Sequence, residues 1–363
     1  MKTVTIVGAR PQFIKLAPMT RALRAAGDTD IVVHTGQHYD TNMSDVFFSE
    51  LEIPPPEYHL DVGSGTHGVQ TGEMLRKIEA VLMKERPSWV IVYGDTNSTL
   101  AGALAASKLS MKIAHVEAGL RSFDRRMPEE INRVLTDHLA DLLLCPSDTA
   151  ATNLRNEGVM GTVEIVGDIM TDALRFAKEK LALDHSIVRR LSMRPGEYLL
   201  ATVHRPENAD SLRRLTELFE VFAELRLPIV FPVHPRTAHM IAVHKLIVPD
   251  NIMRIEPVGY LDMVALMEYA KMILTDSGGM QKEAYWLGIP CVTLRENTEW
   301  VETVASGWNI LVGTDREAIL KAVSEFVKPD SRPELYGDSH VAERCVLALE
   351  RYRCDQEPFT HQV

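Results

Sequence analysis

Short apolar runs alternate with longer amphipathic segments along the whole chain. The runs have the length of strands, and they are apolar at odd and even positions alike. That pattern is typical of strands that helices cover on both faces. The predicted strands are Val4–Val7, Ile31–His34, Val90–Tyr93, Ile113–Val116, Leu142–Cys145, Val163–Val166, Tyr198–Thr202, Ile229–Val233, Met253–Ile255, Met272–Leu274, Cys291–Leu294 and Ile310–Val312. Since alternating strands and helices form right-handed parallel crossovers, the pattern predicts an α/β fold with two doubly wound, Rossmann-like sheets.

The regular alternation of predicted strands and helices is interrupted once, at the helix-like Thr171–Leu183 and the charged, irregular Asp184–Pro195. We therefore predict a first Rossmann-like domain over 1–168 and a second over 169–344. A C-terminal helix at about 345–363 is expected to pack back on the first domain. Parallel α/β sheets bind ligands outside the carboxyl ends of their strands. The expected site is thus a central cleft between the two sheets, with its chemistry just after each strand.

The composition restricts the partners. The chain has 363 residues, with 39 Lys and Arg against 50 Asp and Glu, so its net charge is −11. That balance argues against a nucleic-acid partner, which requires a basic face. The four cysteines lack metal-finger spacing, which argues against a disulfide framework or a structural zinc. No uncharged stretch approaches the roughly 18 residues of a membrane span, and the N-terminus does not resemble a signal peptide. We therefore expect no membrane partner and a cytoplasmic location.

Acidic residues follow three elements of the first half. Asp95 and Glu117 each follow a predicted strand, and Glu129 is the first acid of a Pro-Glu-Glu sequence that opens a helix. Each acid alone could be an ordinary helix cap, with Asp95 the strongest capping candidate. The same acids could bind a divalent metal, although no ligand spacing specifies one. Together they favour acid/base catalysis, which needs carboxylates in tuned, partly buried surroundings.

Groups suited to an anion follow other strands. Arg10 and Lys15 come after the first strand, where the start of a helix could help them to bind an anion. Ser277–Gly279 can present consecutive N–H groups to a diphosphate, and Glu283 could accept both hydroxyls of a ribose. The alternatives are a solvated Arg and Lys on the first helix, and a glycine-rich helix entry without a ligand.

Histidines also stand at strand ends in the second half. His204 follows one predicted strand, and His234, with Arg236 close behind it, follows the next. A single histidine is more often structural, but a strand end makes a functional role more favourable. Gly63–Gly68 matches G-x-G-x-x-G literally, but it does not follow the first strand of a βαβ unit. We interpret it as a loop that enters a helix at Gln70–Glu85, rather than as a site for NAD.

Taken together, these residues resemble the non-hydrolysing UDP-N-acetylglucosamine 2-epimerase family. The resemblance runs from Gly8 to beyond Gly307, over most of the chain. The matching pieces are TGQH at Thr35–His38, GDTNST at Gly94–Thr99, HVEAGLRSFDRRMPEEINR at His115–Arg133, HRPEN at His204–Asn208, PVHPR at Pro232–Arg236 and TDSGGMQKEA at Thr275–Ala284.

The resemblance implies a two-domain glycosyltransferase-B architecture and a homodimer that binds a UDP-sugar and needs neither NAD nor a metal. The catalytic candidates that it implies are Asp95, Glu117, Glu129 and His204. The candidate contacts of substrate or UDP are Arg10, Lys15, Arg133, His234, Arg236, Ser277, Gly278, Gly279 and Glu283.

Several positions differ from the common family pattern. The Arg-Gln pair through which bacterial members bind an activating second substrate molecule aligns near Thr66-His67 and is missing here. The loop at 63–72 and Trp300-Val301 resemble archaeal members or those that act on diacetamido-glucuronate nucleotides. The residues Gln12, Pro206 and Lys282 also replace common family residues. Two substrates therefore stay open, UDP-N-acetylglucosamine and UDP-2,3-diacetamido-2,3-dideoxyglucuronate.

The chemistry expected from the resemblance is inversion at C2 of the sugar. Removal of the C2 proton with loss of UDP would give a 2-acetamidoglucal, and re-addition on the other face would invert C2. Which of the three acids is the base stays open. The competing interpretations are a glycosyltransferase of the same architecture, a hydrolysing epimerase that releases the free sugar, and a non-catalytic sugar-nucleotide sensor.

Overall fold

The computed structural model describes residues 1–37, 41–181 and 186–353 of the protein. His38 of the TGQH sequence and the last ten residues of the expected C-terminal helix lie outside these ranges. Among the helices of the described ranges, none combines the length and the apolar character that crossing a bilayer requires.

The chain forms two compact units. Unit 1 comprises Met1–Ala173 and Tyr336–Val363, and unit 2 comprises Leu174–Leu335. The sequence-based division lay close by, after residue 168 and before residue 345. The return of the chain to unit 1 therefore begins at Tyr336, before the C-terminal helix itself.

The sheet of unit 1 is parallel throughout, with strand order β3-β2-β1-β4-β5-β6-β7. Its strands are β1 (Lys2–Val7), β2 (Thr29–His34), β3 (Tyr58–His59), β4 (Trp89–Tyr93), β5 (Ile113–Val116), β6 (Leu142–Cys145) and β7 (Thr162–Ile165). The two-residue edge strand β3 was not predicted, because it is too short to show a pattern. The order reverses between β1 and β4, which is the topological switch point of a doubly wound sheet.

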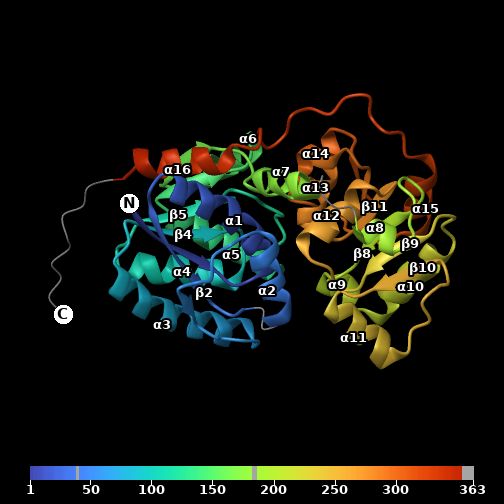
Figure 1. Ribbon diagram of the computed structural model, residues 1–363, viewed down its shortest axis with the longest axis horizontal. Helices are drawn as coiled ribbons and strands as arrows, with labels where there is room; N and C mark the ends of the chain where they lie inside the picture. Colours follow the sequence, from blue (N-terminus) through green and yellow to red (C-terminus); the bar gives the residue numbers. More distant parts are fainter. Residues whose placement is uncertain (38–40, 182–185, 354–363) are drawn as a thin grey trace. The chain divides into compact units, whose positions relative to one another are not determined.

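The helices of unit 1 pack in groups (Figure 1). They are α1 (Arg10–Ala25), α2 (Thr41–Glu50), α3 (His67–Glu85), α4 (Asn97–Lys108), α5 (Pro128–Leu139), α6 (Asp148–Glu157) and α16 (Val341–Arg351). Helix α4 packs between α3 and α5, whereas α1 packs against α2 and α16. The indole N–H of Trp89 donates to the carbonyl of Leu349 at 3.1 Å, which anchors α16 to the sheet of unit 1.

Unit 2 repeats the plan with strand order β10-β9-β8-β11-β12-β13, again all parallel. Its strands are β8 (Leu199–Thr202), β9 (Ile229–Pro232), β10 (Ile252–Ile255), β11 (Met272–Thr275), β12 (Cys291–Thr293) and β13 (Asn309–Leu311). All twelve strands expected from the sequence are present. The central ones are apolar runs buried under helices, whereas β7, β10 and β13 at the sheet edges are partly exposed.

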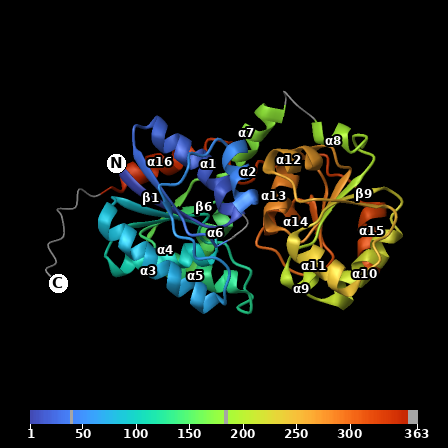
Figure 2. The same cartoon turned by 60° about the horizontal axis from the view of Figure 1, so that its bottom comes forward.

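The helices of unit 2 form two groups (Figure 2). They are α8 (Ser186–Arg190), α9 (Pro206–Ala209), α10 (Leu212–Ala223), α11 (Pro235–His244), α12 (Tyr260–Glu268), α13 (Gly278–Leu287), α14 (Val301–Ala305) and α15 (Arg316–Glu325), with α7 (Met170–Leu181) joining the units. Helix α10 contacts α9 and α15, whereas α13 contacts α12 and α14. The short helix α8 lies within the segment Asp184–Pro195, which was expected to be irregular.

Candidate active site

A buried glutamine ties together the two turns on either side of the switch point in unit 1. The side-chain oxygen of Gln12 accepts from the backbone N–H of Gly8 at 2.8 Å. Its amide nitrogen donates to the carbonyl of Tyr93 at 3.1 Å and to the hydroxyl of Thr99 at 3.0 Å. Gly8 itself has no room for a side chain, because a Cβ there would lie 1.9 Å from the hydroxyl of Thr35. Gln12 therefore fixes the ends of β1 and β4 against each other.

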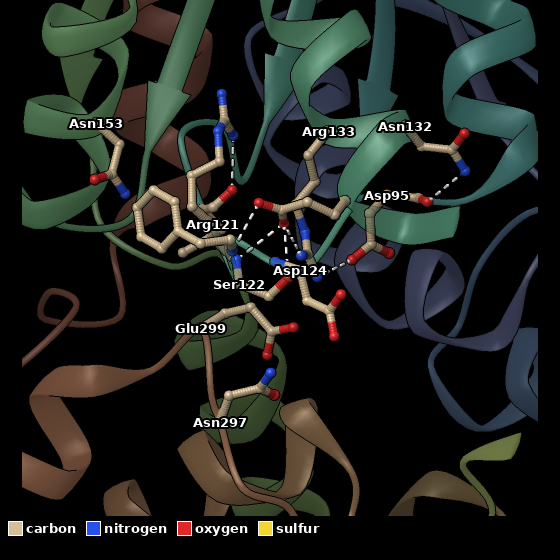
Figure 3. A network of polar contacts seen from close by, with 12 residues as sticks. Asp95, Arg121, Ser122, Asp124, Asn132, Arg133, Asn153, Asn297 and Glu299 are labelled. Atoms are coloured by element: carbon tan, nitrogen blue, oxygen red, sulfur yellow. Dashed lines mark hydrogen bonds and ion pairs between the residues drawn. The ribbon is translucent and has the colours of Figure 1, made fainter. Parts of the chain in front are cut away.

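Asp95 directs its carboxylate toward a buried arginine rather than capping a helix (Figure 3). Arg133 on α5 donates to the Asp95 carboxylate at 2.6 Å, and Asn132 donates to the Asp95 carbonyl at 2.9 Å. The capping interpretation of Asp95 is wrong, since Thr96 is the cap of α4 and accepts from the N–H of Thr99. The side chain of Asp95 remains 30 % exposed, so it is accessible to a ligand.

The two glutamates that open α5 have different surroundings. Glu130 is buried, and its carboxylate accepts from both the N–H and the hydroxyl of Ser122, from the N–H of Phe123 and from Arg133, at 2.8 to 3.0 Å. Glu129 is only half-buried. Glu130 thus holds the loop before α5, and Glu129 is the member of the pair that is exposed enough to meet a substrate.

Glu117 and Lys15 form an ion pair that no local sequence pattern predicts. Both side chains are buried, with 9 % and 6 % of their area exposed. The pair lies against Gly94, where a Cβ would be 3.0 Å from the Glu117 carboxylate. Glu117 has a positive φ of 70°, a conformation that non-glycine residues seldom adopt and that clusters at functional sites. An acid at the end of β5 is therefore held beside a cation from α1.

A buried charge network underlies these turns. His115 on β5 contacts Asp137 on α5, and Arg121 contacts the same carboxylate at 2.7 Å. Arg121 also donates twice to Glu157, at 2.8 and 2.7 Å. Burial raises the pKa of Asp137, but the charges of His115 and Arg121 outweigh burial and lower the pKa below its usual value. Asp137 is therefore an ionised carboxylate in the core of unit 1.

In unit 2, His204 lies at the exit of β8 and contacts a buried aspartate from the exit of β11. The His204 ring nitrogen Nδ1 lies 3.0 Å from the carboxylate of Asp276. The same carboxylate accepts from the N–H groups of His204 and Arg205 and from the amide of Asn208, at 3.0 to 3.2 Å. Burial raises the pKa of Asp276, but His204 and the N–H donors more than compensate, so the pKa lies below its usual value.

The other candidates of unit 2 lie at neighbouring strand ends. The ring of His234 is 5.5 Å from that of His204, and its Nδ1 accepts from the N–H of Arg236 at the start of α11. Arg236 is exposed and pairs with Asp210 at 2.7 Å. Ser277 caps α13, so Gly278 and Gly279 occupy the first turn, and Glu283 is buried on the same helix.

Lys282 and Trp300, two residues that differ from the common family pattern, contact each other. The ammonium of Lys282, which is 1 % exposed, lies 3.8 Å from the ring centre of Trp300. The Trp300 indole nitrogen would lie 3.4 Å from a Cβ at Gly278. The cation–π contact therefore borders the first turn of α13. In the described parts of the chain, no three histidine, cysteine or acidic side chains gather as ligands for a metal.

The two parallel sheets, each with polar groups at its strand ends, form the glycosyltransferase-B type of architecture, as predicted. A family model described as UDP-N-acetylglucosamine 2-epimerase matches residues 21–350. The chain belongs to that epimerase family, which confirms the resemblance found in its motifs.

Individual relatives agree with this assignment. A UDP-N-acetylglucosamine 2-epimerase homologue of Methanococcus maripaludis is 57 % identical over 331 residues, 90 % of this chain and 92 % of that protein. The UDP-2,3-diacetamido-2,3-dideoxy-D-glucuronate 2-epimerase of Pseudomonas aeruginosa is 48 % identical over 362 residues, 97 % and 100 % of the two chains. A crystal structure of the Methanocaldococcus jannaschii UDP-GlcNAc 2-epimerase with UDP-GlcNAc and UDP has a TM-score of 0.90 and 46 % identity, covering 97 % of this chain and 100 % of that one.

The buried residues that hold the candidate site residues in place were not predicted from the sequence. His115 and Asp276 stand inside the quoted motifs but were given no role, and Asp137 lies outside every motif. A polar residue within an otherwise apolar strand, such as His115 in Ile113–Val116, is the signal that could have pointed to the network. For Asp137 no local signal exists, because its partners lie 16 and 22 residues away.

Proposed function

We propose that the protein interconverts UDP-N-acetylglucosamine and UDP-N-acetylmannosamine by elimination and re-addition of UDP. The observation that carries the proposal is the pair of carboxylates on adjacent parallel strands, Asp95 after β4 and Glu117 after β5, each with its own buried cation. Acids held in this way keep a fixed position, which proton transfer to and from a substrate requires.

In the proposed reaction, a carboxylate of unit 1 removes the proton from C2 of the sugar. The C–H electron pair forms the C1=C2 double bond of a 2-acetamidoglucal, and the C1–O bond breaks as UDP takes its electrons. A proton is then delivered to the opposite face of C2, and a phosphate oxygen of UDP attacks C1. Asp95, Glu117 and Glu129 are the proposed proton carriers and stabilise the charge that develops on the ring.

Unit 2 is proposed to hold the departing UDP. The N–H groups at Gly278 and Gly279, in the first turn of α13, suit a diphosphate, and Glu283 on the same helix suits the ribose. His204 is proposed to face the diphosphate, since Asp276 holds its Nδ1 side. Arg10, His234 and Arg236 are the proposed additional contacts of the nucleotide. Lys15 and Arg133 act through the acids with which they pair.

The diacetamido-glucuronate nucleotide is the second candidate substrate, and the 48 % identity to the Pseudomonas aeruginosa enzyme supports it. The reaction at C2 is the same for both nucleotides.

Purified protein should be given each nucleotide separately in deuterated water, and the products followed by NMR. The epimerised substrate gains deuterium at C2 if the proposal is right. Inversion without deuterium would contradict proton exchange, and release of free sugar would indicate a hydrolase.

Variants test the acids one at a time. Asp95→Asn and Glu117→Gln are each expected to lower kcat by about 10²-fold or more, because proton transfer typically contributes 10² to 10⁴-fold. Glu73→Gln is the matched control, since Glu73 is an exposed acid that pairs with its helical neighbour Arg76. Full turnover by Asp95→Asn would remove Asp95 from the catalytic set.

A homodimer and a cytoplasmic location complete the proposal. Ile131 and Leu135, four residues apart on one side of α5, are 45 % and 47 % exposed, which suits contact with a second copy of this chain. The described thiols of Cys145, Cys291 and Cys345 are buried and free, which suits a reducing compartment. Light scattering tests the dimer, and Leu135→Arg should shift the mass to that of a monomer.

A further inference from the structure

His115 has two hydrogen-bond partners that can only accept. The residue is fully buried on β5, between β4 and β6. Its Nε2 lies 2.8 Å from the carbonyl oxygen of Gly94, and its Nδ1 lies 2.7 Å from a carboxylate oxygen of Asp137. A carbonyl oxygen offers no proton, and an ionised carboxylate offers none either. Both ring nitrogens must therefore carry a proton, which makes the ring an imidazolium.

The surrounding charges favour this form. Asp137 is the direct counter-ion, and its second oxygen accepts from Arg121 at 2.7 Å. Glu157 neutralises Arg121 through two hydrogen bonds. The four groups thus carry two positive and two negative charges, so the network has no net charge. The Cys145 thiol on β6 stays neutral, because burial raises its pKa and the Asp137 charge raises it further.

The network joins the turns that bear the two candidate acids. His115 donates to the carbonyl of Gly94, the residue directly before Asp95. Asp137 accepts from the N–H of Gly119 at 3.2 Å, in the turn that begins with Glu117. Asp137 therefore contacts the Glu117 turn directly, and it contacts the Asp95 turn through the ring of His115.

We propose that His115 is a positioning residue that, as an imidazolium bridging Gly94 and Asp137, sets the distance between the Asp95 and Glu117 carboxylates. The inference deepens the proposed function and rests on it. Glu117 has a positive φ of 70°, and such a conformation in a residue other than glycine persists only where surrounding contacts impose it. The two hydrogen bonds of the imidazolium and the Gly119 N–H bond supply those contacts.

The protonation state can be measured directly on the intact protein. Histidine-selective ¹⁵N labelling and NMR at pH 7 should show a ring with a bonded proton on each of its two nitrogens. The signals are assigned to His115 by their loss in His115→Gln. A His115 ring with one unprotonated nitrogen at pH 7 would overturn the proposal, whatever the enzyme's substrate.

Kinetics test the positioning role. A glutamine at 115 has only one amide group and cannot reach both acceptors in opposite directions. His115→Gln is expected to lower kcat by about 100-fold, the effect of displacing a reacting group by about 1 Å. The KM for the sugar nucleotide and the affinity for UDP, measured by calorimetry, should stay within threefold. Asp137→Asn should behave similarly, because its amide removes the counter-ion.

The matched control is His138→Gln, which changes an exposed histidine next to Asp137 on α5. A kcat for His115→Gln within threefold of this control would overturn the positioning role. Equal losses in kcat and in UDP affinity would also overturn it, because they would indicate general unfolding. If neither nucleotide is epimerised by the wild type, the proposed function fails while the NMR result still decides the protonation state.

Discussion

Replacing Asp276 with asparagine removes a buried charge from the turn that carries His204. The carboxylate accepts from the N–H groups of His204 and Arg205 and from the amide of Asn208, and it pairs with Nδ1 of His204. An asparagine side chain has a single acceptor oxygen, and its NH₂ group must then face a donor. Asp276→Asn therefore leaves at least one buried N–H without an acceptor.

The expected destabilisation is about 3 kcal/mol. An orphaned buried donor costs about 1–3 kcal/mol, and losing the charged partner of His204 adds a smaller amount because that ring is 32 % exposed. A domain of about 150–250 residues loses about 2–4 °C in Tm per kcal/mol. Unit 2 should therefore unfold about 6–12 °C lower, and UDP affinity should fall because His204 is no longer oriented.

Calorimetric melting and UDP titration of the variant measure both effects. Asp262→Asn is the control, because Asp262 is a partly exposed aspartate of unit 2 whose pair with Arg190 is solvent-accessible. Its change should stay within about 0.5 kcal/mol. A Tm for Asp276→Asn within 1 °C of the control would refute the role assigned to Asp276.

The pH dependence of the same pair of proteins gives a second check. The folded-state pKa of Asp276 is lowered, so its contribution to stability is complete above the unfolded pKa of about 3.9 and is lost as the pH falls through the folded value. The stability difference between wild type and Asp276→Asn should therefore be present at about pH 5 and should shrink below about pH 4. A difference that grows on acidification would contradict this.

Two further comparisons follow from the packing of unit 1. Gly8→Ala should destabilise by about 1–3 kcal/mol in urea titration, since its Cβ would lie 1.9 Å from the Thr35 hydroxyl, whereas Gly72→Ala, with open space on α3, should stabilise by up to about 1 kcal/mol. Glu130→Gln should lower the Tm by several degrees because its carboxylate holds the loop before α5, whereas Glu129→Gln should keep the Tm and lose turnover. Equal Tm values for the two glutamate variants would contradict the division of roles between them.

The sequence by itself determined the class of fold and the places where chemistry could occur. The central strands are apolar runs that helices bury, so their positions could be predicted from local hydrophobic periodicity. Because the carboxyl ends of parallel strands share one edge of a sheet, Asp95 and Glu117 could be expected near each other, as could His204 and Ser277. The motifs around them were sufficient to indicate the family.

Only the tertiary structure decided which charges meet. Lys15 and Glu117 are 102 residues apart, His204 and Asp276 are 72 apart, and Asp95 and Arg133 are 38 apart. No local pattern encodes such pairs, since they depend on which strands become neighbours and how far each turn extends. The same holds for His115, whose place in the chain indicates only a buried strand residue. Its two hydrogen-bond partners are brought to its ring by other elements, and those elements are positioned by packing of the whole unit.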